Sequence, residues 1–506
     1  MARSLIATLA HRYGPRVSAA QRREFLKLTL AASAGLLMSS NTTLARLGRT
    51  SAKRIVVIGA GFSGLACAYE LKAAGYDVTL LEPRGRVGGR VLSFNAAGGN
   101  EYIKGRNIEG GAELIGSNHP AWINYASKFG LEFLDVTDDE GEAVSPVILG
   151  GKLLDFEEAG TLWEEMEAGL AHMNALAEPV LADEPWKSPD AKKLDDLSIG
   201  KWVESLELSP LAKKGMWINQ MSDNGQDPSR QSLLGQLAAV KGGGLEKFWS
   251  DSEVYRCKGG NDQLARKLAE SIGSDRIVLK LHARSITLKN NAVVVEASDG
   301  RTIECDDVVL TAPPPTWGKI AISPGLPGAM TPQMGLNTKY FAHVKSRFWE
   351  TSEPKRSQYA LSDGVLSQTW DGTDAQGPVD DTNAGACLTA FSGGPEVARA
   401  LSMDKAARDK EFAEIYEQFY PGFKDNLVQT RFMDWPKDPW AGASYSFPAP
   451  GQVTSVGPLL AQAHMGGRLH IAGEHTCYKF VGYMEGALDS GIRVAKNLAK
   501  RDGVLK

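Results

Sequence analysis

A glycine-rich loop at residues 59–64 is the clearest indication of a ligand-binding function in this sequence. Residues 59–64 read GAGFSG; they follow a β-branched run at 54–58 (RIVVI) and precede apolar residues at helical spacing. Gly59 permits a tight turn, Gly61 lets the backbone approach a pyrophosphate, and Gly64 lets helix and strand pack closely. Ser63 lies in the same loop, where the N–H groups of a helix N-terminus would face phosphates.

An acid completes this pattern. A second strand is predicted at residues 76–81 and ends at Glu82, 23 positions after Gly59. A carboxylate at this spacing can accept both ribose hydroxyls of an adenosine, and it disfavours a 2′-phosphorylated cofactor. The order of strand, glycine loop, helix, strand and acid predicts a Rossmann-like dinucleotide-binding unit in an α/β fold of mixed α+β character.

The segment that follows indicates which dinucleotide cofactor the chain binds. Residues 82–90 (EPRGRVGGR) resemble the R-x-G-G-R segment of the flavin amine oxidase family, which includes monoamine, polyamine and L-amino acid oxidases. The resemblance implies FAD as the cofactor and places Gly89 and Arg90 along its pyrophosphate and ribityl chain. Arg84 is expected in the same site.

The resemblance returns at distant points of the chain, at residues 258–264 (KGGNDQL), 307–314 (DVVLTAPP), 469–476 (LHIAGEHT) and 482–491 (GYMEGALDSG). It places the neighbourhood of Ile286 against the adenine and Gly473 and Glu474 near the ribityl chain. It also implies that a helix beginning near Met484 points its N-terminus at the pyrimidine side of the flavin. A positive dipole end there would stabilise negative charge on reduced flavin.

The family pattern also predicts two interleaved domains, in agreement with a chain too long for one compact core. The expected FAD-binding domain comprises residues 50–118, 245–315 and 430–506. The expected substrate-binding domain comprises residues 119–244 and 316–429.

Three residues match the reaction site of the family. Lys339 resembles the lysine that holds a water near flavin N5, and Tyr445 and Tyr483 resemble two aromatic rings that face each other in front of the flavin. Two π-faces form a slot that orients a small amine and attracts its cationic form. Some relatives attach FAD through a cysteine just before the first tyrosine, but Ser444 stands there in this chain, so FAD is expected to bind non-covalently.

One position at which this chain differs from L-amino acid oxidases bears on the kind of substrate. L-amino acid oxidases commonly have a carboxylate-binding arginine after the glycines of the segment at 108–116, where this chain has Glu113. A carboxylate would repel the carboxylate of an amino acid and attract a second ammonium, which favours an amine and even a diamine. The alternatives are that Glu113 is a structural acid, and that an L-amino acid oxidase uses another clamp, such as Arg347 or backbone groups.

The composition argues against nucleic acid, an anionic membrane or a metal ion as a partner of this chain. The 56 Lys and Arg residues nearly balance the 60 Asp and Glu residues, for a formal charge of -4, so neither nucleic acid nor an anionic membrane is an expected partner. The five cysteines are widely spaced and are expected to be small core residues. The histidines have no metal-ligand spacing, so no metal is expected.

The N-terminal residues resemble an export signal. Residues 21–27 (QRREFLK) precede an apolar run of 11 residues at 28–38, which is the layout of a twin-arginine signal with cleavage near Ala45. The expected partner is the twin-arginine export machinery, and the expected location is the periplasm or the medium. The apolar run is too short to span a bilayer, and no span is expected in the mature chain.

The sequence thus predicts an exported FAD-dependent amine oxidase that forms an imine and passes electrons to dioxygen. Besides the L-amino acid oxidase, the alternatives are a dehydrogenase of the same fold with another acceptor, and a flavin-loaded binding protein. A homodimer is a further open alternative.

Overall fold

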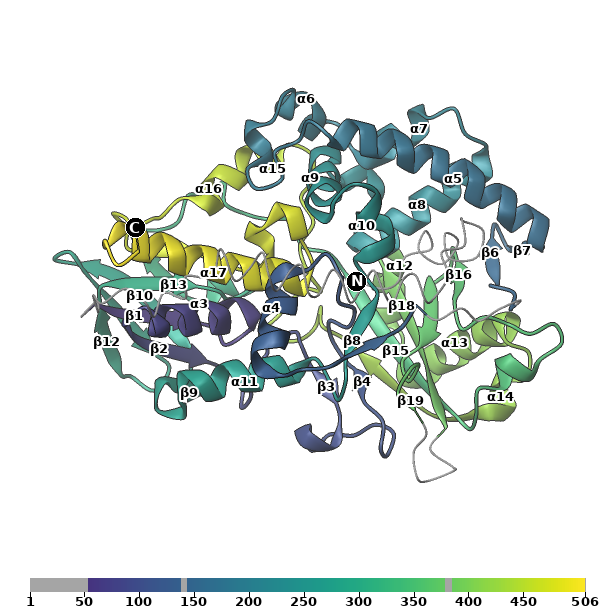
Figure 1. Ribbon diagram of the computed structural model, residues 1–506, viewed down its shortest axis with the longest axis horizontal. Coiled ribbons are helices and arrows are strands. Elements are labelled where there is room, and N and C mark those ends of the chain that lie inside the picture. Colours follow the sequence, from purple (N-terminus) through teal and green to yellow (C-terminus); the bar gives the residue numbers. More distant parts are fainter. Residues whose placement is uncertain (1–52, 138–142, 378–384, 506) are drawn as a thin grey trace.

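A computed structural model describes residues 53–137, 143–377 and 385–505 of the chain. The expected twin-arginine segment lies outside the described residues. The described chain folds into two halves, each built on its own large sheet, with a group of helices above them (Figure 1).

The first half is centred on a five-stranded parallel sheet with the strand order β20-β13-β1-β2-β9. Its outer strands come from the middle and the end of the chain, so three distant segments build it. The strands are β1 (Arg54–Ile58), β2 (Asp77–Glu82), β9 (Ile277–Leu279), β13 (Asp307–Leu310) and β20 (Leu469–Ile471).

Both faces of this sheet are covered, which explains why its strands are continuous apolar runs. Ile55 and Val57 face a helical layer, whereas Val56 and Ile58 face a second sheet, because successive side chains of a strand alternate between faces. The helical layer consists of α3 (Phe62–Ala73), α4 (Pro120–Phe129), α11 (Asp262–Ile272) and α17 (Met484–Arg501).

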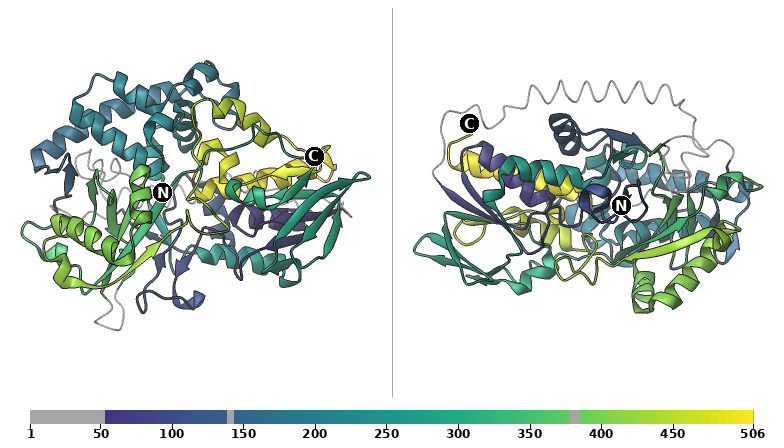
Figure 2. Two further views of the ribbon diagram at one scale, coloured as in Figure 1. Left: turned by 180° about the vertical axis from the view of Figure 1, so that it is seen from behind. Right: turned by 90° about the horizontal axis from the view of Figure 1, so that it is seen from below.

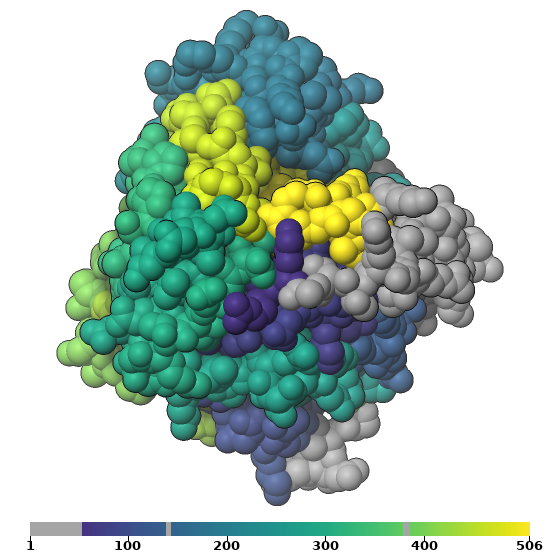
Figure 3. Space-filling model, turned by 90° about the vertical axis from the view of Figure 1, so that its left-hand side faces the viewer, coloured from purple at the N-terminus to yellow at the C-terminus, as the bar shows by residue number. Residues whose placement is uncertain are grey.

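The second sheet has the order β12-β11-β10-β14 and packs its buried valines against the parallel strands. Its strands are β10 (Ala283–Lys289), β11 (Ala292–Ala297), β12 (Thr302–Cys305) and β14 (Ala321–Ser323). At this end of the molecule the C-terminal segment lies between the upper helices and the teal strand region (Figure 3).

The other half contains a seven-stranded sheet with the order β19-β15-β18-β17-β16-β6-β7. Helix α13 (Lys405–Phe419) packs its aromatic side chains on one face of β15 and β18. The strands are β6 (Val147–Leu149), β7 (Lys152–Leu153), β15 (Asn337–Val344), β16 (Ala360–Ser362), β17 (Gln368–Asp371), β18 (Ala386–Gly393) and β19 (Leu427–Met433).

The upper helices form a separate apolar cluster that reaches the sheet edge at β6. They are α5 (Phe156–Ala177), α6 (Ala191–Asp196), α7 (Ile199–Ser205), α8 (Pro210–Asn224), α9 (Leu233–Gly243) and α10 (Glu246–Asp251). Seen from behind, they bridge the two halves (Figure 2). Short pieces complete the chain: β3 (Ser93–Phe94) with β4 (Ile108–Glu109), β5 (Phe133–Asp135) with β8 (Tyr255–Cys257), α12 (Pro395–Ser402), α14 (Phe423–Asn426), α15 (Gln452–Ser455) and α16 (Gly457–Ala461).

The mixed α/β class predicted from the sequence is confirmed, but the cores do not end at the expected domain boundaries. Helix α4 lies beyond residue 118, yet Trp122 and Tyr125 are buried in the core beside α3. Strand β19 lies on both sides of residue 430 and pairs with β15. The chain passes from one core to the other without a change in composition, so composition does not mark these limits.

Two further observations concern the described residues. All five cysteines are buried and free, which confirms the expectation that they are core residues. In the described part of the chain, none of the helices combines the length and apolar character needed to cross a bilayer.

Candidate active site

The glycine loop joins β1 to α3 and behaves as the spacing predicts. Gly59 has φ +107° and donates its N–H to Leu81 O at 2.8 Å. A Cβ on Gly64 would lie 1.9 Å from Gly59 O, so only glycine lets the helix start this close to the strand. A Cβ on Gly61 would meet nothing within 4 Å, because Gly61 borders open space in a cavity.

The cavity extends from this loop to the substrate half. Its volume is about 1490 Å³, including the part that is open to solvent. Most of the residues expected at the cofactor line it: Gly59, Gly61, Ser63, Glu82, Arg84, Gly89, Arg90, Gly473, Glu474, Tyr483 and Met484.

Glu82 stands at the end of β2, beside the loop. Its two carboxylate oxygens accept the N–H groups of Ala60 at 2.8 Å and Arg84 at 2.9 Å. Burial raises the pKa of Glu82, and these two hydrogen bonds oppose that shift. The fixed carboxylate retains lone pairs that can accept hydroxyl groups of a ligand.

The R-x-G-G-R segment lies against the glycine loop, with Gly88 donating its N–H to Ala60 O at 2.8 Å. Arg84 lines the cavity, but its guanidinium forms a bidentate pair with Asp438, at 2.8 Å for one of the two bonds. Arg84 therefore clamps this segment to the chain that leads to Tyr445.

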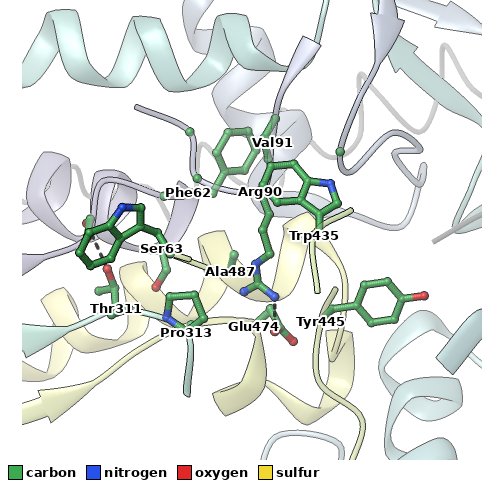
Figure 4. Close-up of a pocket in the computed structure, with 18 of the residues that line it drawn as sticks. Phe62, Ser63, Arg90, Val91, Thr311, Pro313, Trp435, Tyr445, Glu474 and Ala487 are labelled. Atoms are coloured by element: carbon green, nitrogen blue, oxygen red, sulfur yellow. Dashed lines mark hydrogen bonds and ion pairs between the residues drawn. The ribbon is translucent and has the colours of Figure 1, made fainter. Parts of the chain in front are cut away.

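Arg90 points across the cavity floor toward Glu474 (Figure 4). Its Nη1 donates to Ser444 O at 2.6 Å and to Glu474 Oε1 at 3.2 Å. Glu474 also accepts the Ser446 hydroxyl at 2.7 Å and the Gly482 N–H at 3.1 Å. This pair of a partly buried arginine and a buried glutamate therefore fixes the two segments that carry the tyrosines.

Tyr445 and Tyr483 both line the end of the cavity that faces the substrate half. The Tyr445 hydroxyl points away from Arg90 and donates to the backbone oxygen of Asp223 (Figure 4). Tyr483 precedes α17, and its hydroxyl lies 3.4 Å from Glu253 Oε1. Burial raises the pKa of both phenols well above its usual value, so both remain neutral.

Lys339 reaches the same cavity from β15, and its ammonium is surrounded by polar and charged groups. Its Nζ lies 2.6 Å from Glu113 Oε2 and 3.1 Å from Glu109 O. Glu113 Oε1 accepts Arg256 Nε at 2.7 Å and Trp370 Nε1 at 2.8 Å. We name Lys339, Glu113 and Arg256 the buried ion network.

This geometry corrects the expected role of Glu113. Its carboxylate is only 2% exposed and both oxygens already have cationic partners, so it is not available to a second substrate ammonium. Burial raises the pKa of Glu113, but Lys339 and Arg256 outweigh burial and hold it below the usual range. Glu113 is the structural acid of the alternative hypothesis.

Two other expected residues lie elsewhere. Ile286 is fully buried between the two sheets and does not line the cavity, where His282 and Ala283 stand instead. The residues that line the cavity here therefore precede Ile286 by three and four positions. Arg347, the proposed carboxylate clamp, pairs with Asp371 at 2.6 Å and does not line the cavity.

Sequence reasoning missed several lining residues, including Asn337, Phe391 and Trp435. Phe391 lies opposite Lys339 in the β15–β18 register, a long-range pairing with no local sequence pattern. Ser444 lines the cavity where some relatives have cysteine, and it donates to Asn337 Oδ1 at 2.7 Å. None of the five cysteines lines this cavity.

A parallel sheet with a glycine loop at the edge of a large cavity defines a dinucleotide-dependent enzyme. The family model for flavin containing amine oxidoreductase matches residues 62–499, so the chain belongs to this family. A second model, for pyridine nucleotide-disulphide oxidoreductase, matches residues 2–108 and covers the glycine loop.

Individual relatives agree. The chain is 26% identical over 473 residues to amine oxidase [flavin-containing] A of Canis lupus familiaris, covering 88% of this chain and 84% of that protein. Its fold is similar to cyclohexylamine oxidase from Brevibacterium oxydans, with a TM-score of 0.76, 23% identity and coverage of 89% and 99%. A putrescine oxidase structure gives a TM-score of 0.77 at 23% identity, with coverage of 90% and 100%.

The chain is therefore an FAD-dependent amine oxidoreductase, and the cavity fits that cofactor. The open space at Gly61 accepts a pyrophosphate, and Glu82 is placed for an adenosine ribose. The N-terminus of α17, beginning at Met484, borders the other end of the cavity. These three groups would hold the phosphates, the adenosine and the flavin, respectively.

The two loop glycines give a matched test of this fit. Gly61→Ala should fold normally, because its Cβ meets no protein atom, but should bind FAD about tenfold more weakly or worse, because the Cβ occupies the pyrophosphate position. Gly64→Ala should instead destabilise the protein itself by about 1–3 kcal/mol or more. Thermal unfolding of the apoprotein and FAD titration separate the effects. A Gly61→Ala protein with unchanged FAD affinity would contradict the assignment.

The buried ion network predicts a stability effect. Glu113→Gln should lower the free energy of unfolding by about 3–5 kcal/mol at neutral pH, because it leaves Lys339 and Arg256 buried without their counter-charge. Denaturant titration measures it, with Glu132→Gln, at an exposed pair with Lys258, as the control without a measurable shift.

The pH dependence of that difference has a definite sign. Because the folded pKa of Glu113 is lowered, its contribution is complete above the ordinary glutamate value of about 4.3 and declines as the pH falls through the folded value. A difference that grew on acidification would mean that Glu113 is not the ionised partner.

Proposed function

We propose that the chain catalyses the oxidative deamination of an amine, with dioxygen as the electron acceptor. The observation that carries this proposal is that Tyr445, Tyr483 and Lys339 line the same cavity as the glycines of the dinucleotide loop. When bound, FAD accepts a hydride from the α-carbon of the amine and passes two electrons to dioxygen, which with two protons gives hydrogen peroxide.

The tyrosines position the substrate in this proposal. Their neutral, buried rings offer π-faces to a small amine and exclude bulk water from the reacting carbon. The amine must lose its ammonium proton to react, so activity should fall at low pH. The resulting imine is hydrolysed by water to a carbonyl compound and ammonia or a smaller amine.

Lys339 has the donors for a water-holding role. An ammonium has three N–H donors, and two of them are directed at Glu113 and Glu109. The third is available to a water in the cavity that Lys339 lines. Glu113 and Arg256 do not touch the cavity and act through Lys339, as positioning residues.

We propose non-covalent FAD, supported by Ser444 at the position where some relatives have cysteine and by the finding that none of the five cysteines is among the residues that line the cavity. We also propose export through the twin-arginine route, supported by residues 21–27 and the short apolar run after them. Fractionation that finds the mature protein only in the cytoplasm would contradict export.

An amino acid oxidase is disfavoured by the position of Arg347, the arginine considered for a carboxylate clamp. Arg347 is paired outside the cavity, and Arg256 is committed to Glu113. A clamp made by backbone groups is the form of this alternative that the arginines leave open.

The test is anaerobic reduction of the bound flavin by monoamines, diamines and L-amino acids, followed by admission of air and peroxide detection. We expect bleaching by amines and prompt peroxide. Bleaching by amino acids alone would replace the proposal by the amino acid oxidase, and slow reoxidation in air would indicate a dehydrogenase. A protein that no substrate bleaches would be a binding protein.

A further inference from the structure

A second cavity lies apart from the one that fits FAD and the amine. Its volume is about 860 Å³, including the part that is open to solvent, and none of the described residues lines both cavities. It is enclosed by the connection that follows α5, by α16, by β20 and by the C-terminal part of α17. The upper helices, α16 and α17 adjoin on the face of the molecule that Figure 3 shows. The proposed reaction does not use this cavity.

Arg493 on α17 brings to this cavity hydrogen-bond donors that the protein does not use. Its Nη2 donates to Thr476 O at 2.9 Å and to Thr476 Oγ1 at 2.8 Å. Among the described residues, the guanidinium has no ion pair and no other hydrogen-bond partner, so the three N–H donors on Nη1 and Nε remain available. An arginine with free donors at a cavity wall is suited to bind a carboxylate.

The acidic side chains around this cavity already have cationic partners. Asp183 and Asp489 lie 2.9 and 3.2 Å from the ammonium of Lys479, and Glu184 lies 2.7 Å from that of Lys187. The two acids that line the cavity are 79% and 50% exposed, so water also screens their charges. Their carboxylates therefore do not take up the free donors of the arginine.

Part of the cavity wall is apolar and held in place. Trp186, Leu460 and Val494 line it. The indole of Trp186 meets the ring of Tyr478 edge to face, with 6.0 Å between the ring centroids. A Cβ on Gly457 would lie 2.6 Å from the same indole, which shows how closely α16 packs against it. This wall is suited to a flat apolar group.

We propose that the second cavity is a binding site for a small organic carboxylate with a flat apolar body, a ligand distinct from the amine substrate. The carboxylate accepts the free N–H groups of Arg493, and the apolar body lies against Trp186. Thr476, which Arg493 holds, ends the turn Glu474–Thr476, and Glu474 lines the first cavity. Arg493 thus connects the second cavity to a turn of the cofactor site.

The test is calorimetric titration of the FAD-loaded protein with benzoate, with benzamide as its uncharged counterpart and with acetate as the carboxylate without a ring. We expect one benzoate per chain. Benzoate should bind about ten- to a hundredfold more tightly than benzamide, the range for hydrogen bonds to charged groups. Acetate should bind more weakly than benzoate because it makes no contact with the indole.

Two variants on α17 give a matched comparison. Arg493→Gln keeps a donor for Thr476, so the fold should be retained, and it should remove the preference for benzoate over benzamide. Lys496→Gln removes a positive charge at an exposed position outside the cavity and should leave the preference unchanged. Thermal unfolding of both variants checks that they are folded.

The visible absorbance of the flavin during the benzoate titration shows which cavity is filled. Binding in the second cavity should leave this spectrum nearly unchanged, because no described residue lines both cavities. A spectral change that saturates together with benzoate binding would place the ligand in the first cavity and overturn the proposal. Absence of binding, equal affinities for benzoate and benzamide, or an unchanged preference in Arg493→Gln would also overturn it. Amine oxidation would stand in each case.

Discussion

The buried ion network is the interaction on which the arrangement of the site depends. Glu113 follows β4 on the dinucleotide side, Arg256 lies in β8, and Lys339 and Trp370 belong to the seven-stranded sheet. One carboxylate thus joins the two halves of the molecule. Charges this deeply buried are costly unless paired, so the pairing restricts Lys339 to one position at the cavity wall. The same constraint removes Glu113 from substrate recognition.

A second set of contacts holds the opposite wall. Arg90 and Glu474 fix the segments that carry Tyr445 and Tyr483. Arg84, which follows the glycine loop, pairs with Asp438 and so fixes the chain that leads to Tyr445. The side chains expected to react are therefore held in place by residues that also line the part of the cavity expected to hold the cofactor. Binding of the cofactor and orientation of the two tyrosines thus depend on the same residues, which suits an enzyme whose redox chemistry belongs to its cofactor.

Local patterns predicted the dinucleotide unit because each glycine has a local reason: a positive φ at Gly59, open space at Gly61 and a close helix approach at Gly64. Lys339, Tyr445 and Tyr483 were identified only through the family resemblance. The ion pairs of Glu113 and the position of Phe391 in the cavity wall depend on strands that are far apart in the sequence. No local residue spacing encodes how those strands pair. Ile286 was misassigned because a strand pattern does not say which of its residues reaches the cavity and which enters the core.

We propose that the buried ion network holds Lys339 for the reaction of reduced flavin with dioxygen. Stopped-flow measurement of Lys339→Met, with reduction by amine and reoxidation by dioxygen followed separately, tests it most directly. We expect reoxidation to slow by about tenfold or more, equivalent to at least ~1.4 kcal/mol in the barrier, and by a larger factor than reduction. Reoxidation at the wild-type rate in a variant that retains its FAD would contradict it.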